Sequence, residues 1–187
     1  MISATLDKQV STRNSVDIDA NGVEKRTNRR ANALADRLEE GAELLAAFAE
    51  KLTADQWDTP VSANDKRTIG LIVNHVALMY PIEVGAVKAI ASGEPVADVT
   101  WEVVADINAG QAAEHAGVTK EAAVELLRRN SREAADAIRQ LTDEELDTAA
   151  PFSLAYGAPV TAQFVIEDHP LRHPWHHLFR IKTALGK

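Results

Sequence analysis

The chain has 187 residues with a formal net charge of −8, and it contains no cysteine. This length suits one domain and is short for two. The absence of cysteine excludes disulfides, thiolate metal ligands and thiol nucleophiles supplied by the chain itself. Nucleic acid is not expected as a partner, because proteins that bind it normally carry a basic patch that neutralises phosphates.

Hydrophobic residues make up 45% of the chain, whereas aromatic residues make up only 5%. Alanine and leucine supply most of the apolar content, and both have high helix propensity, while strands favour β-branched and aromatic residues. The composition therefore predicts an all-α domain. No segment near the start is typical of a signal peptide, and no apolar run approaches the about 20 residues that span a bilayer. We therefore expect a cytoplasmic protein that does not associate with membranes.

Residues 1–27 are polar, rich in Ser, Thr, Asn and Asp, and without a helical period. Such a segment buries too little apolar surface to offset the entropy lost on ordering. We interpret it as an N-terminal arm, which could pack on a partner subunit. The domain itself is then predicted to cover residues 28–187.

Four long helices are predicted from apolar residues that recur at three-, four- and seven-residue spacing, at residues 28–52, 68–92, 119–141 and 161–187. Pro81 lies inside the second and is expected to kink it. Capping-box sequences that start at Thr53 and Thr142 predict two short extra helical turns. Residues 94–118 are less regular, and 149–160 predict a loop or small hairpin. Together these elements predict a four-helix bundle with short extra helices.

The last predicted helix is rich in histidine. Four of the six histidines lie within nine residues, at His169, His173, His176 and His177. His173 and His177 are four residues apart, so on a helix their rings project from the same face. This spacing lets one helix offer two imidazoles to one metal ion. Such pairs also arise by chance in histidine-rich stretches, so the pair alone does not establish a site.

His75 lies on an apolar stripe of the second predicted helix. A histidine that faces a core must have its ring nitrogens satisfied. One interpretation is a core histidine bonded to a backbone carbonyl or a carboxylate. The other is a third metal ligand that faces the C-terminal pair across the bundle, where side chains from facing helices build metal sites. Three imidazoles without a thiolate would leave positions open for water, and they suit zinc, nickel, iron or copper.

Pro170 and Pro174 interrupt the histidine-rich stretch, and each removes a backbone hydrogen bond. Either the helix kinks, or it restarts with Pro174 at its first position, where proline is tolerated. In the second case His173 would be the cap residue. His169 would then be a substitute ligand.

Four segments of the chain match a known pattern in order and spacing. They are Leu44-Leu45 to Trp57-Asp-Thr-Pro60, Thr68-Ile-Gly-Leu-Ile-Val-Asn-His75-Val, Leu141-Thr-Asp-Glu-Glu-Leu146 and His173-Pro-Trp-His-His177-Leu-Phe-Arg-Ile181. Over roughly residues 30–187 the chain resembles the DinB/YfiT-like superfamily of metal-binding four-helix bundles. It departs from the common His-x-Gly-Gln-Ile ending at Phe179 and Arg180.

The resemblance implies one ligand from the second helix and two from the last, which are His75, His173 and His177. It implies a divalent metal ion, with zinc or nickel expected first and iron as a further option, and often a homodimer. Members include isomerases and S-transferases that use mycothiol or bacillithiol, hydrolases that depend on a metal, and bundles without known activity.

Two classes of function are therefore predicted. The first is an enzyme in which a divalent metal activates water or a small-molecule thiol cosubstrate. The alternative is a non-catalytic, stress-associated metal-binding bundle. No catalytic acid or base is identified, although Asp168, Glu83 and Tyr80 lie near the ligands in sequence, and an aspartate that orients a ligand imidazole is favoured. A polar stripe of Asn108, Gln111 and His115 is interpreted as a solvated face, with a pocket wall as the alternative.

Overall fold

The computed structural model describes residues 17–18, 24–25 and 28–187. Most of the predicted arm of residues 1–27 thus lies outside the described residues. Its two described pieces are the short strands β1 (Asp17–Ile18) and β2 (Glu24–Lys25), which pair in an antiparallel manner.

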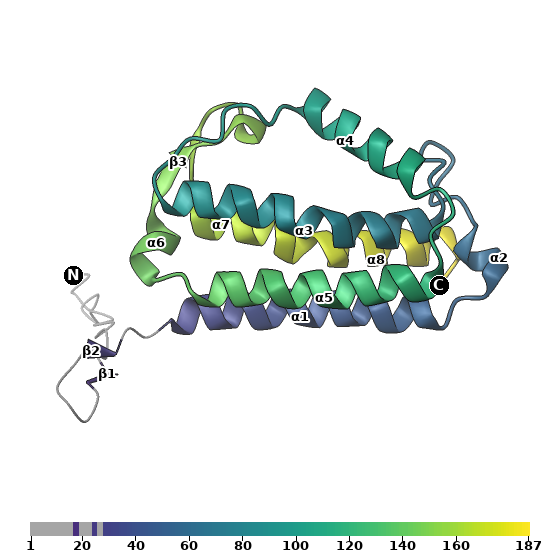
Figure 1. Ribbon diagram of the computed structural model, residues 1–187, viewed down its shortest axis with the longest axis horizontal. Helices are drawn as coiled ribbons and strands as arrows, with labels where there is room; N and C mark the ends of the chain where they lie inside the picture. Colours follow the sequence, from purple (N-terminus) through teal and green to yellow (C-terminus); the bar gives the residue numbers. More distant parts are fainter. Residues whose placement is uncertain (1–16, 19–23, 26–27) are drawn as a thin grey trace, which may run out of the picture.

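The remaining chain forms the predicted all-α four-helix bundle (Figure 1). Its helices are α1 (Arg29–Glu50), α3 (Ile69–Ala91), α5 (Lys120–Arg139) and a composite last helix. The composite helix consists of α7 (Ala162–Ile166), a π-helical segment (Glu167–Leu171) and α8 (Arg172–Ala184). Helix α5 packs between α1 and α3, and the composite helix closes the bundle between them on the other side. Helices α1 and α3 therefore lie diagonally across the bundle.

The short predicted elements are also present. Helices α2 (Ala54–Trp57) and α6 (Asp143–Asp147) both begin at the predicted capping boxes, with Thr53 and Thr142 as N-caps. Residues 149–160 contain the hairpin of β3 (Ala149–Pro151) and β4 (Pro159–Thr161), in which Ala150 pairs with Val160. A single 3₁₀ turn, Ser153–Ala155, lies between these strands.

The segment 94–118 is more regular than predicted, because it contains helix α4 (Trp101–Glu114). Thr100 caps this helix by accepting a hydrogen bond from the backbone N–H of Val103. None of its residues is fully buried, so it has no apolar stripe for the periodicity to reveal. Figure 1 shows α4 lying obliquely along α3, outside the four-helix core.

Helix α3 supplies much of the buried core and runs as one helix through Pro81, which lies on its exposed side. By length and composition α3 could cross a membrane, so the expectation that no run approaches that length does not hold for it. However, 67% of its most apolar 18-residue stretch is buried inside the bundle. Mostly buried core helices pass the same test, so the match is weak evidence for a span.

Phe179 and Arg180, the two residues at which the chain departs from the common family ending, have different surroundings in the structure. The Phe179 side chain is exposed, whereas Arg180 donates a hydrogen bond of 3.1 Å to Oδ2 of Asp65 in the loop before α3. Arg67 binds the same carboxylate through two hydrogen bonds. Arg67, and secondarily Arg180, hold the pKa of Asp65 well below its ordinary value. Arg180 thus ties the last helix to the loop that leads into α3.

Gly70 is required by close packing near the start of α3. A Cβ atom at this position would clash with the indole ring of Trp57, which is itself buried. We expect Gly70→Ala to lower the free energy of unfolding by about 1–3 kcal/mol, the range for overpacking a core. The matched control is Gly85→Ala on the same helix, where a Cβ would meet open space. Denaturant unfolding should show Gly85→Ala at or above wild-type stability, because alanine favours a helix over glycine.

Candidate metal centre

Three histidines from two helices converge inside the bundle. His75 comes from the first half of α3, and His173 and His177 come from α8. Each ring offers one nitrogen, and these three nitrogens all lie within 4.8 Å of one another. The ring centroids are 4.8–5.5 Å apart. The structure thus brings together the three predicted ligands, placed to hold one metal ion.

The π-helical segment contains Pro170, whereas Pro174 and the two predicted ligands of the last helix lie in the α-helix that follows it. Pro170 lies inside this segment, and Pro174 is the third residue of α8. His173 has helical backbone as the second residue of α8, so the predicted restart with His173 as cap is wrong. His173 and His177 are four residues apart within α8, so their rings project from the same face of this helix.

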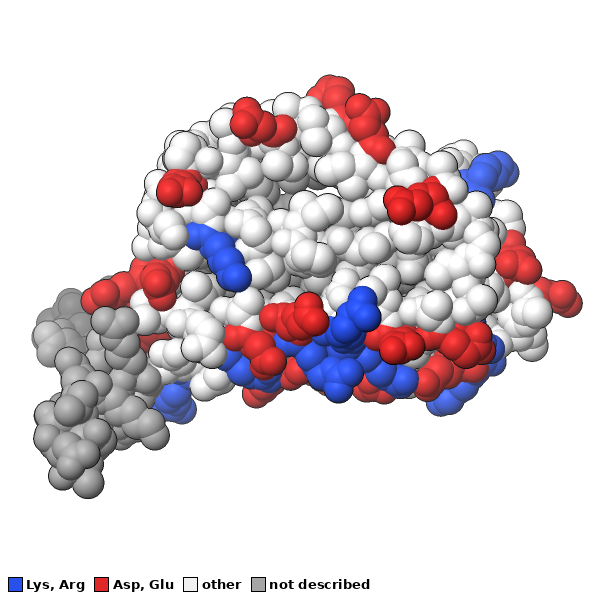
Figure 2. All heavy atoms as spheres, viewed as in Figure 1, with Lys and Arg blue, Asp and Glu red and all other residues white. Residues whose placement is uncertain are grey.

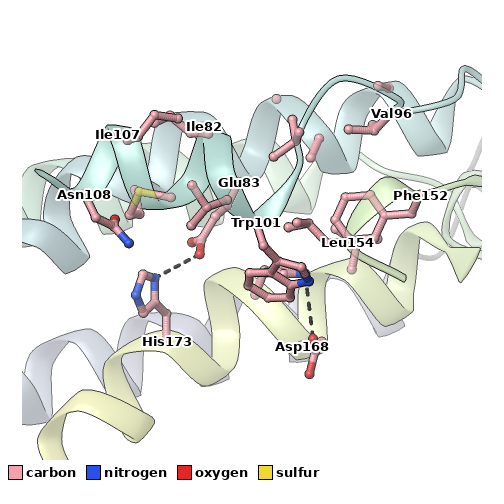
Figure 3. Close-up of a pocket in the computed structure, with 18 of the residues that line it drawn as sticks. Ile82, Glu83, Val96, Trp101, Ile107, Asn108, Phe152, Leu154, Asp168 and His173 are labelled. Atoms are coloured by element: carbon pink, nitrogen blue, oxygen red, sulfur yellow. Dashed lines mark ion pairs between the residues drawn. The ribbon is translucent and has the colours of Figure 1, made fainter. Parts of the chain in front are cut away.

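Two of the ring nitrogens are held by other side chains. Nδ1 of His75 lies 3.1 Å from Oε1 of Gln111 on α4, within a hydrogen bond. Nδ1 of His173 lies 2.9 Å from Oε1 of Glu83 on α3, an ion-pair contact whose angle is not that of a hydrogen bond (Figure 3). When these Nδ1 atoms carry the proton, Nε2 of each ring is free to bind a metal.

Burial keeps the imidazoles of His75 and His177 neutral. It lowers the pKa of His75 to about 4, with the nearby His173 as a second cause. Burial also lowers the pKa of His177 far below its ordinary value, again with His173 next in importance. Neutral imidazole is the form that binds metals, so no proton has to be displaced from these two rings at neutral pH.

The donor set fits a divalent ion. Nδ1 of His177 is buried and has no hydrogen-bond partner among the described residues. An unpaired polar atom in a core is costly, and this nitrogen would gain the partner it lacks if it were the atom of His177 that binds the ion. The fit of the site to a divalent ion rests on the unpaired Nδ1 of His177 together with the oriented rings of His75 and His173.

The substitute ligand His169 does not join the trio. Its ring packs edge-on against Phe152, and its Nε2 lies 3.7 Å from Oδ2 of Asp168. Asp168 also pairs with Arg172 rather than with a predicted ligand. The carboxylate that contacts a predicted ligand is therefore Glu83, not the aspartate that was favoured. Tyr80, the third residue considered, is buried in the core.

A pocket of about 550 Å³ opens beside the trio, between α3, α4, the hairpin and the composite helix (Figure 3). All three histidines line it. Figure 2 shows this face hollowed and mostly uncharged below α4, whereas acidic and basic side chains crowd along α1 and α5. Asn108 lines the pocket and Gln111 contacts His75, so the solvated-face interpretation is wrong for both.

Gln111 could be predicted only weakly from the amino-acid sequence, and Glu83 less still. Gln111 belonged to the polar stripe, for which a pocket wall was only the alternative to a solvated face. Glu83 lies eight residues after His75, about two helical turns along the same face of α3. Its burial identifies it, because a carboxylate in a core needs a charged or polar partner. The spacing alone did not reveal that its partner is His173.

Gln111→Ala should weaken metal binding without removing a ligand. Outer partners of metal-binding histidines typically contribute 10–100-fold to affinity, because they fix the ring and its tautomer. We therefore expect an increase of about tenfold or more in the dissociation constant for Zn²⁺, measured by competition with a chromogenic chelator. Glu114→Ala, at an exposed position of the same helix, is the control. Equal affinities for the two variants would show that Gln111 does not orient His75.

The comparisons with known proteins agree with this architecture. The model of the DinB superfamily matches residues 23–179. Among solved structures, YfiT from Bacillus subtilis aligns with a TM-score of 0.64 and 19% identity, covering 88% of this chain and 89% of YfiT. YfiT is described as a probable metal-dependent hydrolase with an unusual four-helix bundle topology. No curated protein matches significantly. Because the family model spans most of its length, the chain belongs to the DinB superfamily.

Proposed function

We propose that this protein is a divalent-metal-dependent enzyme that activates a small nucleophile, with water in a hydrolase as the first candidate. The observation that carries the proposal is the meeting of three imidazole nitrogens at the wall of a pocket large enough for a substrate. His75, His173 and His177 would hold the ion, with zinc or nickel expected before iron. When bound, such an ion lowers the pKa of a water or thiol next to it.

The surrounding residues have separate roles in this proposal. Gln111 and Glu83 orient His75 and His173 through their Nδ1 atoms. The second carboxylate oxygen of Glu83, Oε2, is buried and has no hydrogen-bond partner among the described residues. It is therefore available to take a proton from a nucleophile in the pocket. The mainly apolar walls lower the polarity around these groups, which strengthens their polar interactions.

The description of YfiT as a probable metal-dependent hydrolase supports the choice of water as nucleophile. Thiol transfer is the second candidate. The chain has no cysteine, so a reacting thiol would have to arrive as a small-molecule cosubstrate. A bundle that binds metal without turnover is the alternative from another class.

Assays on metal-loaded protein separate these functions. Protein loaded in turn with Zn²⁺, Ni²⁺ and Fe²⁺ is tested against uncharged aryl esters and amides, with and without an added low-molecular-weight thiol. Turnover that needs only metal supports the hydrolase. Turnover that also needs thiol supports the transferase. Stoichiometric metal with no turnover of either kind would support the non-catalytic alternative.

A further inference from the structure

The pocket beside the trio has mainly apolar walls. The apolar side chains come from α3, α4 and the hairpin region, and include Met79, Ile82, Trp101, Ile107, Phe152 and Leu154. Its volume of about 550 Å³ lies within the range of about 300–1,000 Å³ that is typical of small-molecule sites. These walls fit the apolar body of a ligand.

The charged groups of the pocket are mostly acidic. Its lining includes the carboxylates of Glu83, Asp98 and Asp168 and the guanidinium of Arg172. Their formal charges leave the lining at −2, and one divalent ion held by the trio would cancel this. A loaded pocket is then formally neutral, and a metal-free pocket is negative.

The cationic group of the lining is already engaged. Nε of Arg172 lies 3.4 Å from Oδ1 of Asp168 and donates a hydrogen bond to the backbone carbonyl of the same residue. In the metal-free pocket an anionic ligand would therefore meet three carboxylates and one guanidinium, which is itself paired with Asp168.

Two polar side chains, one of them uncharged, lie at the end of the pocket nearest to the three histidines. Asn108 on α4 and Glu83 on α3 both reach toward His173 (Figure 3). Oδ1 of Asn108 is buried without a hydrogen-bond partner among the described residues. A carboxamide offers both a donor and an acceptor, so it suits a carbonyl, amide or hydroxyl group.

We propose that this pocket selects uncharged molecules with an apolar body and a polar group directed at the histidine trio, and that it discriminates against anions. The selection deepens the proposed function, because it names the substrate class of the same site. The binding preference itself follows from walls and charges of the chain and requires no turnover. A ligand charge placed next to a like charge of the protein costs free energy, so the carboxylates of the lining disfavour anionic ligands.

A pair of fluorescent probes tests this selection directly. N-phenyl-1-naphthylamine is uncharged, and 8-anilinonaphthalene-1-sulfonate has the same aromatic body with one added negative charge. Titrations of zinc-free full-length protein, whose pocket lining carries a formal charge of −2, should give a dissociation constant at least about tenfold lower for the uncharged probe. The difference should narrow in zinc-loaded protein, where the ion cancels this charge.

Two variants locate the binding. Ile107→Lys adds a positive charge to the pocket wall on α4, a helix without fully buried residues. It should weaken binding of the uncharged probe and improve binding of the anionic one. Phe179→Ala is the control, because Phe179 belongs to a separate exposed apolar patch with Leu44, Phe48 and Trp175. This control should leave both dissociation constants unchanged.

The results separate the two proposals. Equal affinity for the two probes in zinc-free wild-type protein, or an Ile107→Lys protein with unchanged affinities, would overturn the pocket's selectivity. Probe selectivity in a protein that retains no zinc would uphold the selectivity while the metal-dependent function fails. Zinc binding and turnover with no preference between the probes would do the reverse.

Discussion

Replacing His177 with alanine is expected to raise the dissociation constant for Zn²⁺ by more than about 100-fold. That figure is the upper end of the loss caused by an outer partner of a ligand, and removal of a ligand itself should exceed it. His177 is buried, and its ring nitrogen lies within 4.8 Å of the nitrogens offered by His75 and His173. The alanine variant leaves only two imidazoles at the site. Competition with a chelator of known affinity measures the change.

The adjacent residue provides the matched control. His176 is exposed and belongs to the same histidine-rich run, but it lies outside the trio. His176→Ala should therefore bind Zn²⁺ within about threefold of the wild type. Circular dichroism of both variants checks that the bundle remains folded. A fold-retaining His177→Ala protein with wild-type affinity would remove His177 from the site.

The second large effect is expected from Glu83→Gln. If Oε2 of Glu83 accepts a proton from the nucleophile, its loss should lower kcat by about 10²–10⁴-fold, the usual contribution of a general base. Metal affinity should change much less, because the carboxamide oxygen of glutamine keeps a polar contact with Nδ1 of His173. KM should also stay close to the wild-type value. Steady-state kinetics on protein of matched metal content measures this separation.

Asp98→Asn makes the same chemical change at the exposed rim of the same pocket. We expect its kcat to remain within about threefold of the wild type. A similar loss in both variants would indicate a general charge effect. An unchanged kcat in Glu83→Gln would exclude Glu83 as the proton acceptor and leave it only the orientation of His173.

Much of this architecture could be predicted from the sequence because its signals are local. The capping boxes at Thr53 and Thr142 satisfy backbone donors through neighbours three residues away, so their pattern is visible in the chain. The core helices show their apolar stripes for a similar reason, since each buries one face. The trio was predicted from the spacing of His173 and His177, the apolar setting of His75 and the family resemblance.

The features that escaped prediction depend on tertiary contacts. Helix α4 has no fully buried residue, so its role as a pocket wall leaves no periodic pattern. The π-helical segment resolves the conflict between Pro170 and the helix by a change in helical winding that propensity does not encode. Glu83 and Gln111 were separated in sequence from the rings that they contact, and only the packing of α3 and α4 against α8 and each other shows which carboxylate or amide is used.

Elemental analysis of the wild-type and His75→Ala proteins, each incubated with one equivalent of Zn²⁺ and then desalted, tests the central claim most directly. His75 is the predicted ligand on α3 and lies beside the predicted pair on α8. We predict about one zinc ion per wild-type chain and less than one tenth of that in the variant. A wild type that retains no stoichiometric metal, or a folded His75→Ala protein that retains it fully, would contradict the assignment of the trio as a metal centre.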